Sequence, residues 1–422
     1  MKLELPKGVR DLGPEDMLLK NELISKIKRV YENYGYAPLE TPTFERAEVL
    51  GAKAAGDSES LNEWFTFQDQ GKRDLALRYD LTVPFARFIA MNPTMKMPFK
   101  RYQVGQVYRD GPIKLGRFRE FTQFDADVVG SKSMAADYEV VEMALAAYDA
   151  LGMQTYIIVN NRKLLDELLA KSKVPEKQWG KSILVLDKID KIGAKGVEDE
   201  LRSSGLKEEQ IESLLQVANV KGNNNEKLAF FEKLLGETEG IKELKEFFSF
   251  VTDERIKFEP ALARGFSYYT GTVFEAYMKS AEVERSCGGG GRYNKLIAQL
   301  LGAKQEYPAV GFSIGLDVIL TEMQQKRKGA NKTPVQVYVV PIGTLKESMK
   351  ITKELRVKGI NVDIDLKNRG ITKNLNYANS MGIKYCLIIG EDEIKAKKFK
   401  LKDMGTGKER TGSILDVMKL MS

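Results

Sequence analysis

The sequence predicts an α/β protein whose first part is built around an antiparallel hairpin and whose last part is a separate α/β domain. Residues 101–129 alternate apolar and polar residues on both sides of a turn-rich loop, which indicates two paired strands. Residues 162 to about 251 are rich in Lys, Glu and Leu at helical spacing, which indicates an all-helical insertion. After residue 333, strand and helix patterns alternate and a hairpin follows over 399–411, which predicts a mostly parallel sheet with a final hairpin.

The composition is that of an ordinary globular protein. With 422 residues, 43% of them hydrophobic and 30% charged, we expect two or three domains. The net charge of +7 permits a nucleic-acid patch without requiring one. The N-terminus has no signal-peptide pattern and no apolar run reaches membrane-spanning length, so we expect a cytoplasmic protein without membrane contact.

The reactive side chains available to this chain are restricted. Its two cysteines, Cys287 and Cys386, are far apart and predict neither a disulfide framework nor a zinc cluster. Histidine is absent, which excludes an imidazole base, a histidine-containing triad and a histidine-ligated metal. Any catalysis must therefore use arginines, carboxylates, amides and phenols.

The chain begins with a predicted helix and a short hairpin. The helix starts near Pro14, continues to about Tyr34 and ends at Gly35. Residues 64–67 and 74–78 flank Asp-Gln-Gly-Lys and predict the hairpin. Asp80 and Thr82 then precede a helix predicted over 83–91. By itself Asp80 is most simply a cap of that helix, the alternative being a binding-site acid.

The central hairpin concentrates arginines at one end. Arg109 ends its first strand, Arg117 and Arg119 begin its second, and Lys114 lies in the loop between them. Arginines fixed in this way suit a polyphosphate, because guanidinium remains charged and binds oxygens bidentately. The alternative is a surface hairpin with scattered arginines. Against it, one alternating set of the second strand carries Phe121, Gln123, Asp125 and Asp127.

The second half of the chain carries two glycine-rich segments. Residues 134–151 predict a helix and 156–160 a buried strand, both before the helical insertion. In Ala-Arg-Gly-Phe-Ser-Tyr-Tyr-Thr-Gly, over 263–271, two glycines bracket Tyr268 and Tyr269, and a strand follows over 272–277. The glycines of 287–293 permit close backbone approach to a ligand and stand between two strand-like stretches.

Together these segments resemble the class II aminoacyl-tRNA synthetases, and among them the histidyl branch. Residues 100–130 resemble the second class motif, and residues 263–271 match the histidyl signature RGxxYYTG. The helix and extended segment up to Pro42 resemble the first motif, found at the dimer interface, and 308–320 the third. The residues after 333 resemble the anticodon-binding domain of this branch.

The resemblance implies a catalytic domain over 1–323, built on an antiparallel class II sheet flanked by helices, with the helical insertion at about 162–251. A linker over 324–333 and an anticodon-binding domain over 334–422 would follow. It also implies a homodimer that uses L-histidine, ATP with Mg²⁺ and tRNA(His), without zinc or an organic cofactor. Arg109 and Arg264 would be catalytic, and with Arg117 would bind ATP. Histidine would be bound by Asp80, Thr82, Gln123, Asp127, Tyr268 and Tyr269, and tRNA by Lys114, Lys367 and Arg369.

Two positions depart from the family pattern. Val318 stands where the third motif has an ATP-binding arginine, and Ser267 stands where many relatives have aspartate. The resemblance implies a histidyl-tRNA synthetase that forms histidyl-adenylate and transfers histidine to tRNA(His). The alternative is a catalytically impaired regulatory paralogue that binds histidine or tRNA. The signature arginine and the C-terminal domain favour the enzyme, whereas Val318 favours the paralogue.

Overall fold

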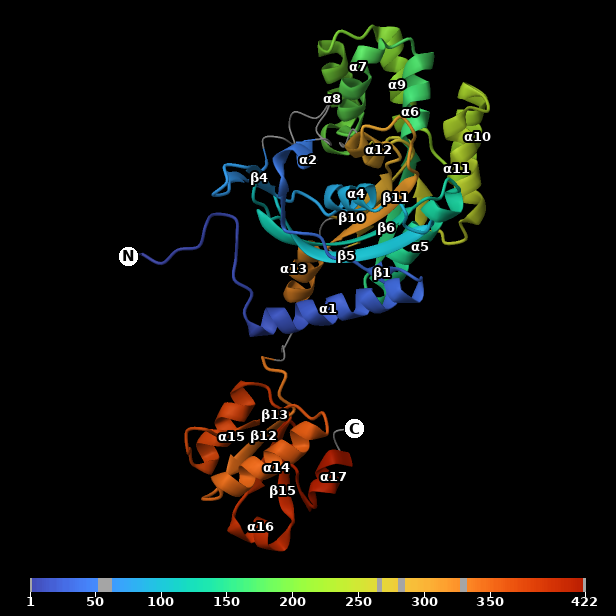
Figure 1. Ribbon diagram of the computed structural model, residues 1–422. Helices are drawn as coiled ribbons and strands as arrows, with labels where there is room; N and C mark the ends of the chain where they lie inside the picture. The colour runs from blue at the N-terminus through green and yellow to red at the C-terminus, as the bar shows by residue number, and fades with distance from the viewer. Residues whose placement is uncertain (1, 52–62, 264–267, 280–284, 327–331, 420–422) are drawn as a thin grey trace. The chain divides into compact units, whose positions relative to one another are not determined.

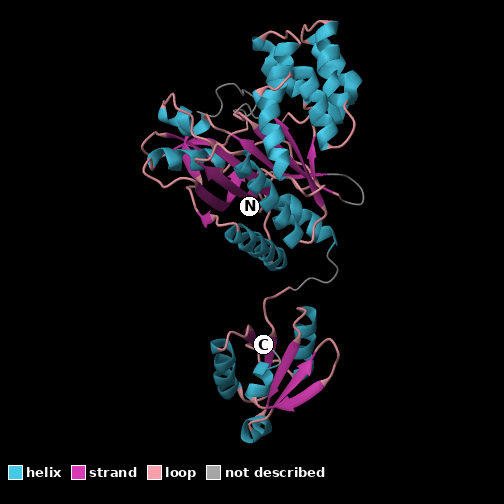
Figure 2. Cartoon of the chain, turned by 90° about the vertical axis from the view of Figure 1, so that its right-hand side faces the viewer, coloured by secondary structure: helices cyan, strands magenta, loops and turns pink. Residues whose placement is uncertain are grey.

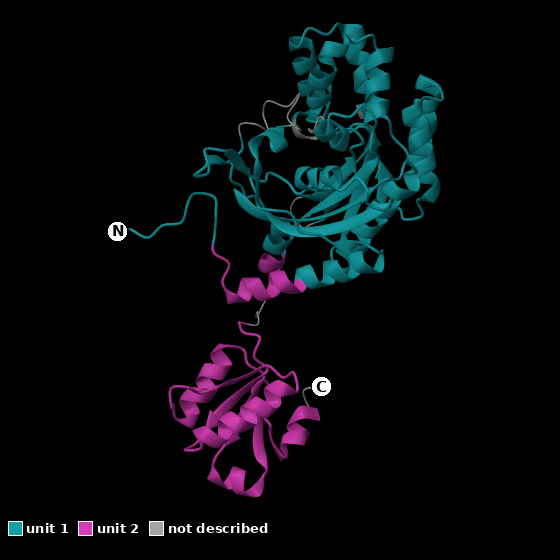
Figure 3. Cartoon of the chain, in the orientation of Figure 1, with its two compact units in different colours: residues 1–10, 23–322 teal, residues 11–22, 323–422 magenta. Residues whose placement is uncertain are grey.

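The fold is described from a computed structural model (Figure 1), which covers residues 2–51, 63–263, 268–279, 285–326 and 332–419. The chain divides into two compact units (Figure 3): residues 1–10 with 23–322, and residues 11–22 with 323–422. None of the helices within the described ranges has the length and apolar character needed to cross a membrane.

An eight-stranded sheet forms the centre of the first unit (Figure 2), in the order β1-β5-β6-β11-β10-β9-β7-β8. Adjacent strands of this sheet pair antiparallel, except for the two outermost pairs, β1 with β5 and β7 with β8, which are parallel. The strands are β1 (Ala37–Pro38), β5 (Phe99–Tyr108), β6 (Glu120–Val129), β7 (Thr155–Asn161), β8 (Ile256–Phe258), β9 (Thr272–Met278), β10 (Arg285–Arg292) and β11 (Ala309–Gly315). The antiparallel sheet expected from the sequence is confirmed.

The predicted central hairpin is the pair β5 and β6. Its register places Arg101 opposite Asp127 and Gly105 opposite Gln123. Because side chains alternate between the two faces of a strand, the odd-numbered residues of both strands share one face. The even-numbered residues face the other side, where the ring of Tyr31 meets that of Phe124 edge-on at 5.0 Å between centroids.

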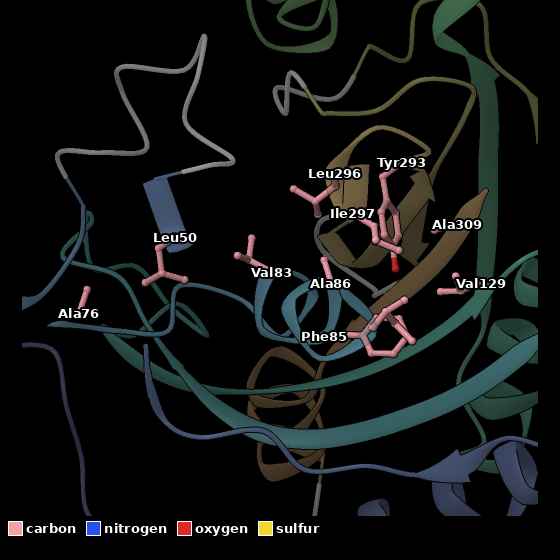
Figure 4. Packing of buried hydrophobic residues seen from close by; sticks show 11 residues of the cluster. Leu50, Ala76, Val83, Phe85, Ala86, Val129, Tyr293, Leu296, Ile297 and Ala309 are labelled. Atoms are coloured by element: carbon pink, nitrogen blue, oxygen red, sulfur yellow. The ribbon is translucent and has the colours of Figure 1, made fainter. Parts of the chain in front are cut away.

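Helices cover both faces of this sheet, as predicted. Tyr31 belongs to the long N-terminal helix, while Phe85 of α4 stacks on Phe99 on the opposite face. Figure 4 shows the apolar cluster there, which includes Phe85, Ala86, Leu296, Ile297 and Tyr293. These helices are α1 (Pro14–Asn33), α4 (Thr82–Met91), α5 (Met134–Ala150), α12 (Leu296–Leu301) and α13 (Leu316–Lys326).

A small antiparallel sheet, in the order β2-β4-β3, lies in the same unit. Its hairpin is the one predicted around Asp-Gln-Gly-Lys, since β3 pairs with β4. The elements are β2 (Phe44–Arg46), α2 (Ala47–Gly51), β3 (Thr66–Gln68) and β4 (Asp74–Leu77).

The predicted insertion is wholly helical in its described residues, and its burial follows the helical period. In α6, for example, Leu164, Leu165, Leu168 and Leu169 are all buried. The three asparagines at 223–225 start a helix: Asn223 caps α10 by accepting a bond from the backbone N–H of Glu226. The helices are α6 (Arg162–Lys171), α7 (Glu176–Leu186), α8 (Ile189–Ser203), α9 (Glu208–Asn219), α10 (Asn224–Leu235) and α11 (Glu239–Phe250).

The second unit contains a five-stranded sheet in the order β13-β12-β14-β15-β16. As predicted, β12 pairs parallel with β13 and β14, and residues 399–412 form a hairpin, β15 with β16. Because the hairpin adds two antiparallel pairs, the sheet is half parallel and not mostly parallel. The elements are β12 (Val337–Pro341), α14 (Leu345–Val357), β13 (Val362–Ile364), α15 (Ile371–Ser380), β14 (Tyr385–Ile389), α16 (Glu391–Ala396), β15 (Phe399–Asp403), β16 (Glu409–Gly412) and α17 (Ile414–Lys419).

The segment expected to be a linker, 324–333, is partly helical. Helix α13 continues to Lys326, and Gln324 within it donates a side-chain hydrogen bond to Asp16 at 2.5 Å. Residues 327–331 of the expected linker lie outside the described residues. The polar residues 324–326 are therefore the exposed last residues of α13, which does not end at Met323.

Candidate active site

A cavity of about 340 Å³ opens on the face of the large sheet that carries the odd-numbered residues of β6. It combines residues from the hairpin, the start of α4, the glycine-rich strand β10 and the third-motif segment. Eight of the predicted site residues line it: Asp80, Thr82, Arg109, Arg117, Gln123, Asp127, Tyr268 and Tyr269. Lys114 does not, and Arg264 and Ser267 lie outside the described residues.

Arg109 is held rigidly at one end of the cavity. Its guanidinium carbon lies 4.2 Å from the ring centroid of Tyr79 and 5.1 Å from that of Phe121. Its Nε donates to the backbone carbonyl of Tyr79 at 3.2 Å. The two rings orient the guanidinium plane, and its other two nitrogens have no hydrogen bond or ion pair to any residue that the structure describes. Arg109 is thus a preorganised cation.

The two other arginines of the hairpin differ from each other. Arg119 pairs with Asp110 at 2.8 Å, and it is not part of the cavity lining. Arg117 is exposed, lines the cavity and has no ion-pair partner within the described part of the chain. Val318 lines the cavity as well, in place of the arginine of the family motif, and Arg117 is a cation of the same cavity lining.

Asp80 both caps helix α4 and lines the cavity. Its Oδ1 accepts the backbone N–H groups of Thr82 at 3.1 Å and Val83 at 2.9 Å. The carboxylate is buried and belongs to the cavity lining together with Thr82. The two interpretations of this acid are therefore compatible, because the helix-capping bonds fix the orientation in which the carboxyl group faces the cavity.

The floor of the cavity carries buried polar atoms that lack a hydrogen-bond partner among the described residues. They belong to strands β6 and β11 and are Gln123 Oε1, Asp125 Oδ1 and Ser313 Oγ. Asp127 Oδ2 beside them lies in an ion pair with Arg101 Nη2 at 2.6 Å. Each such atom costs roughly 1–3 kcal/mol when left unpaired, so their grouping in one cavity indicates a site for a polar ligand.

Asp125 is the floor residue that sequence reasoning left without a role. Burial raises its pKa to about 7, with Asp127 acting in the same direction and Arg101 against it. Period-two alternation placed it on the same face as Gln123 and Asp127, so the signal was present in the sequence. Ser313, Glu63 and Tyr293 also line the cavity, and no local pattern distinguishes them.

The aromatic wall comes from the histidyl signature segment. The rings of Tyr268 and Tyr269 lie 4.4 Å apart, and the Tyr268 hydroxyl donates to that of Tyr269 at 3.3 Å. The glycines of 287–293 lie between strands β9 and β11 in the sequence, are themselves part of strand β10, and line the cavity. A Cβ on Gly290 would lie 1.9 Å from the carbonyl oxygen of Gly311, so glycine allows close strand pairing here.

An N-terminal residue supports this site although the sequence gave no reason to expect it. Arg10 Nη2 pairs with Asp317 Oδ1 at 2.7 Å, and its guanidinium lies 3.9 Å from the Phe118 ring centroid. The other oxygen of Asp317 accepts the backbone N–H of Thr122 at 2.6 Å. The N-terminal segment is therefore bonded to both the hairpin and α13, beside the cavity.

The residues predicted to contact tRNA in the second unit lie on one turn after β13. Lys367 is exposed, but the Nε of Arg369 donates to Asp365 at 3.0 Å and its Nη2 to the Tyr338 hydroxyl at 3.0 Å. Asn374 donates to the same carboxylate at 3.1 Å. Arg369 is thus part of a buried polar network, while Lys367 remains available to a ligand.

This network predicts that Asp365→Asn destabilises the second unit by about 2 kcal/mol near pH 6. Burial raises the pKa of Asp365, but hydrogen bonds from Lys367, Arg369 and Asn374 outweigh it and lower the pKa from 3.8 to about 2. A lowered pKa contributes stability above pH 4 that is lost as the pH falls toward 2. Urea unfolding of the full chain, with the second unit followed by pulse proteolysis, measures this difference.

The matched control for that experiment is Asp363→Asn, on the same strand. Asp363 is half-buried and accepts a bond from the N–H of Ile364, so its replacement should change stability little. A stability loss in Asp365→Asn that is equal at pH 3.5 and pH 6 would contradict the role of its carboxylate charge.

Comparison with known proteins agrees with this geometry. Residues 8–319 match the family model described as histidyl-tRNA synthetase, and residues 336–422 match that described as anticodon binding domain. Histidine--tRNA ligase 1 of Bacillus cereus is 40% identical over 97% of this chain and 95% of its own. The solved histidyl-tRNA synthetase from Nostoc sp. PCC 7120 is 31% identical with a TM-score of 0.87, covering 100% of this chain and 99% of that chain.

A solved ATP phosphoribosyltransferase regulatory subunit/histidyl-tRNA synthetase from Bacillus halodurans C shares the fold. It is 24% identical with a TM-score of 0.76, covering 92% of this chain and 98% of that chain. The match to the histidyl-tRNA synthetase model spans the large sheet, the helical insertion and the residues that line the cavity. This chain therefore belongs to the histidyl-tRNA synthetase family.

Proposed function

We propose that this chain is a histidine--tRNA ligase, which activates L-histidine with ATP and transfers it to tRNA(His). The observation that carries the proposal is the composition of the cavity: a fixed arginine at one end and unpaired buried carboxylate and amide oxygens on its floor. Such a cavity suits two ligands bound side by side: one that places a phosphate at the arginine, and one that offers hydrogen-bond donors to the floor.

Histidine supplies the donors that the floor requires. Asp80 and Gln123, with Thr82, would bind the α-ammonium group, whose three N–H groups match oxygen acceptors. Asp127, with Tyr268 and Tyr269, would bind the imidazole. Amino acids of similar shape that lack ring N–H groups would leave these buried oxygens unpaired, and that penalty provides selectivity.

The chemical step requires positioning and charge stabilisation. An oxygen of the histidine carboxylate forms a bond to the α-phosphorus of ATP, the bond from that phosphorus to the bridging oxygen breaks, and pyrophosphate leaves with Mg²⁺. The attacking carboxylate is already ionised, so no general base is needed, which fits a chain without histidine. Arg109 would stabilise the charge on the α-phosphate, and Arg264 is proposed, from the signature motif, to do so from the other side.

Transfer would follow in the same site, where the terminal adenosine hydroxyl of tRNA(His) attacks the histidyl carbonyl and releases AMP. Lys114, Lys367 and Arg369 remain proposed tRNA contacts, Arg369 with the restriction that its side chain already binds Asp365. A cytoplasmic homodimer that uses MgATP as substrate, without zinc or an organic cofactor, completes the proposal.

The regulatory paralogue is not favoured. The full-length relatives at 40% identity are histidine--tRNA ligases, and this chain retains the anticodon-binding domain. Val318 was the feature in favour of the paralogue, and Arg117 lines the cavity beside it as a cation that could bind phosphate.

The proposed function is tested by histidine-dependent pyrophosphate exchange, with each of the twenty amino acids offered in turn. The expected result is exchange with histidine alone, followed by charging of tRNA(His). Histidine binding without exchange would favour the paralogue, and exchange with another amino acid would overturn the substrate assignment.

Val318 leads to a prediction about the two hairpin arginines. Arg117→Ala should raise the KM for ATP at least tenfold, because a cavity-lining cation without an ion pair loses a charge-assisted bond worth about 1.5–3 kcal/mol. Arg119→Ala is the matched control. Because Arg119 is paired with Asp110 outside the cavity lining, its loss should leave the KM for ATP within about threefold. Equal changes in both variants would contradict this assignment.

A further inference from the structure

A fully buried arginine, Arg101, lies beside the cavity floor, on the same face of the sheet as Asp127. Its side chain is 0% exposed, and its Nη2 lies 2.6 Å from Oδ2 of Asp127, the residue directly opposite it on the hairpin. The same nitrogen donates to the backbone carbonyl of Leu81 at 3.1 Å. Arg101 thus connects strand β6 to the segment that carries Asp80 and Thr82.

The stability of the fold does not explain this arginine. Its Nε and Nη1 have no hydrogen-bond partner within the described residues, and one face of its guanidinium lies 4.3 Å from the Phe85 ring centroid. Buried ion pairs of this kind are often matched or exceeded in stability by apolar residues of similar volume. The contact that accounts for a charge at this position is therefore the ion pair with Asp127.

Three groups together fix the Asp127 carboxylate. Tyr293 donates its hydroxyl to Oδ1 at 2.5 Å, and Arg101 forms the ion pair with Oδ2. A Cβ on Gly311 would lie 2.0 Å from Oδ1, so the carboxylate occupies space that only glycine leaves open. Oδ2 lies in an ion pair with Arg101, and because a carboxylate oxygen can accept more than one hydrogen bond, it can also accept one from a ligand.

We propose that Arg101 is a positioning residue for histidine specificity: it keeps Asp127 ionised and oriented to accept the imidazole N–H, and it holds the 80–82 segment at the matching distance for the ammonium group. This inference rests on the proposed function. It assigns Arg101 to binding of the amino acid and not to binding of ATP, because its contacts reach Asp127 and Leu81 but not the arginine end of the cavity.

The test compares Arg101→Met with Arg101→Lys in the full-length chain. We expect Arg101→Met to raise the KM for histidine about 30- to 100-fold, the usual consequence of removing one partner of a buried charge pair, with the KM for ATP changed less than threefold. Arg101→Lys keeps the charge, so the logarithm of its KM for histidine should rise by no more than two thirds of the rise in Arg101→Met. Equal increases in both KM values would overturn the inference.

A double-mutant cycle with Asp127→Asn decides whether Arg101 acts through Asp127. Once Asp127 is neutral, replacing Arg101 by Met should raise the KM for histidine less than threefold further, so the two effects should be strongly non-additive. Additive effects would show a merely structural role and overturn the inference. Arg87→Met is the matched control, since it removes an Arg–Glu45 ion pair at 2.7 Å outside the cavity lining and should leave the KM for histidine unchanged.

Calorimetric titration of the unmutated chain with histidine separates this inference from the proposed function. Absence of both histidine binding and exchange would overturn the proposed function and this inference with it. If the unmutated chain and Arg101→Met bind histidine equally well, the inference about Arg101 alone is overturned. Thermal unfolding of Arg101→Met and Arg87→Met, which should be equally stable, checks that both variants are folded.

Discussion

Replacing Arg109 by Met should lower histidine-dependent pyrophosphate exchange about 10³-fold, because removing one preorganised donor to a developing charge costs about that factor in kcat. The cause is specific to the geometry: two aromatic rings and the Tyr79 carbonyl already orient this guanidinium, so it needs no rearrangement when charge develops on the α-phosphate. Single-turnover formation of the adenylate measures the effect directly, with histidine binding expected to change less than tenfold.

The control for this variant is Arg46→Met. Arg46 has a side chain that is 68% exposed and lies outside the cavity lining, so its loss should not affect exchange. If Arg109→Met retained more than a tenth of the exchange rate of the unmutated chain, the proposed role of Arg109 at the α-phosphate would be wrong.

The second large effect is expected for Gly311→Ala, which should lower the specificity constant for histidine at least 100-fold. The added Cβ would lie 2.0 Å from Asp127 Oδ1 and 2.9 Å from the carbonyl oxygen of Ala126, so the carboxylate must move. A displacement of about 1 Å at such a group can cost 10²-fold in rate. Steady-state exchange at varied histidine and fixed ATP measures the loss.

Gly180→Ala provides the comparison for Gly311→Ala. Gly180 lies in α7 with nothing within 4 Å of an added Cβ, and alanine is favoured over glycine inside a helix. This variant should keep full activity. A normal KM for histidine in Gly311→Ala would contradict the role assigned to the position of the Asp127 carboxylate.

The local sequence was sufficient for most elements and for much of the site. Period-two alternation predicted β5 and β6, because successive side chains of a strand point to opposite faces of the sheet. The same alternation placed Gln123, Asp125 and Asp127 on one face, and the structure brings these three side chains into the cavity. The specific roles of the site residues came from the family resemblance, which supplied the chemistry that spacing alone could not.

Local composition left two structural outcomes open in two segments. Consecutive glycines are compatible with a loop or with a strand, and in β10 the close approach of β11 leaves no room for a Cβ at Gly288 or Gly290. The polar residues after Met323 are compatible with a linker or with an exposed helix end, and α13 continues to Lys326. In both cases the deciding interactions come from distant parts of the chain.

The sequence by itself determined the class of fold, the helical insertion, the arginines of the hairpin and the membership suggested by the signature tyrosines. Those features depend on residue type and short spacing, which are local. Tertiary structure alone decided that Arg101 faces Asp127, that Tyr293 donates to the same carboxylate, and that Arg10 pairs with Asp317 across 307 positions of sequence. These pairings depend on strand register and on packing of remote segments, and neither is encoded in any short stretch.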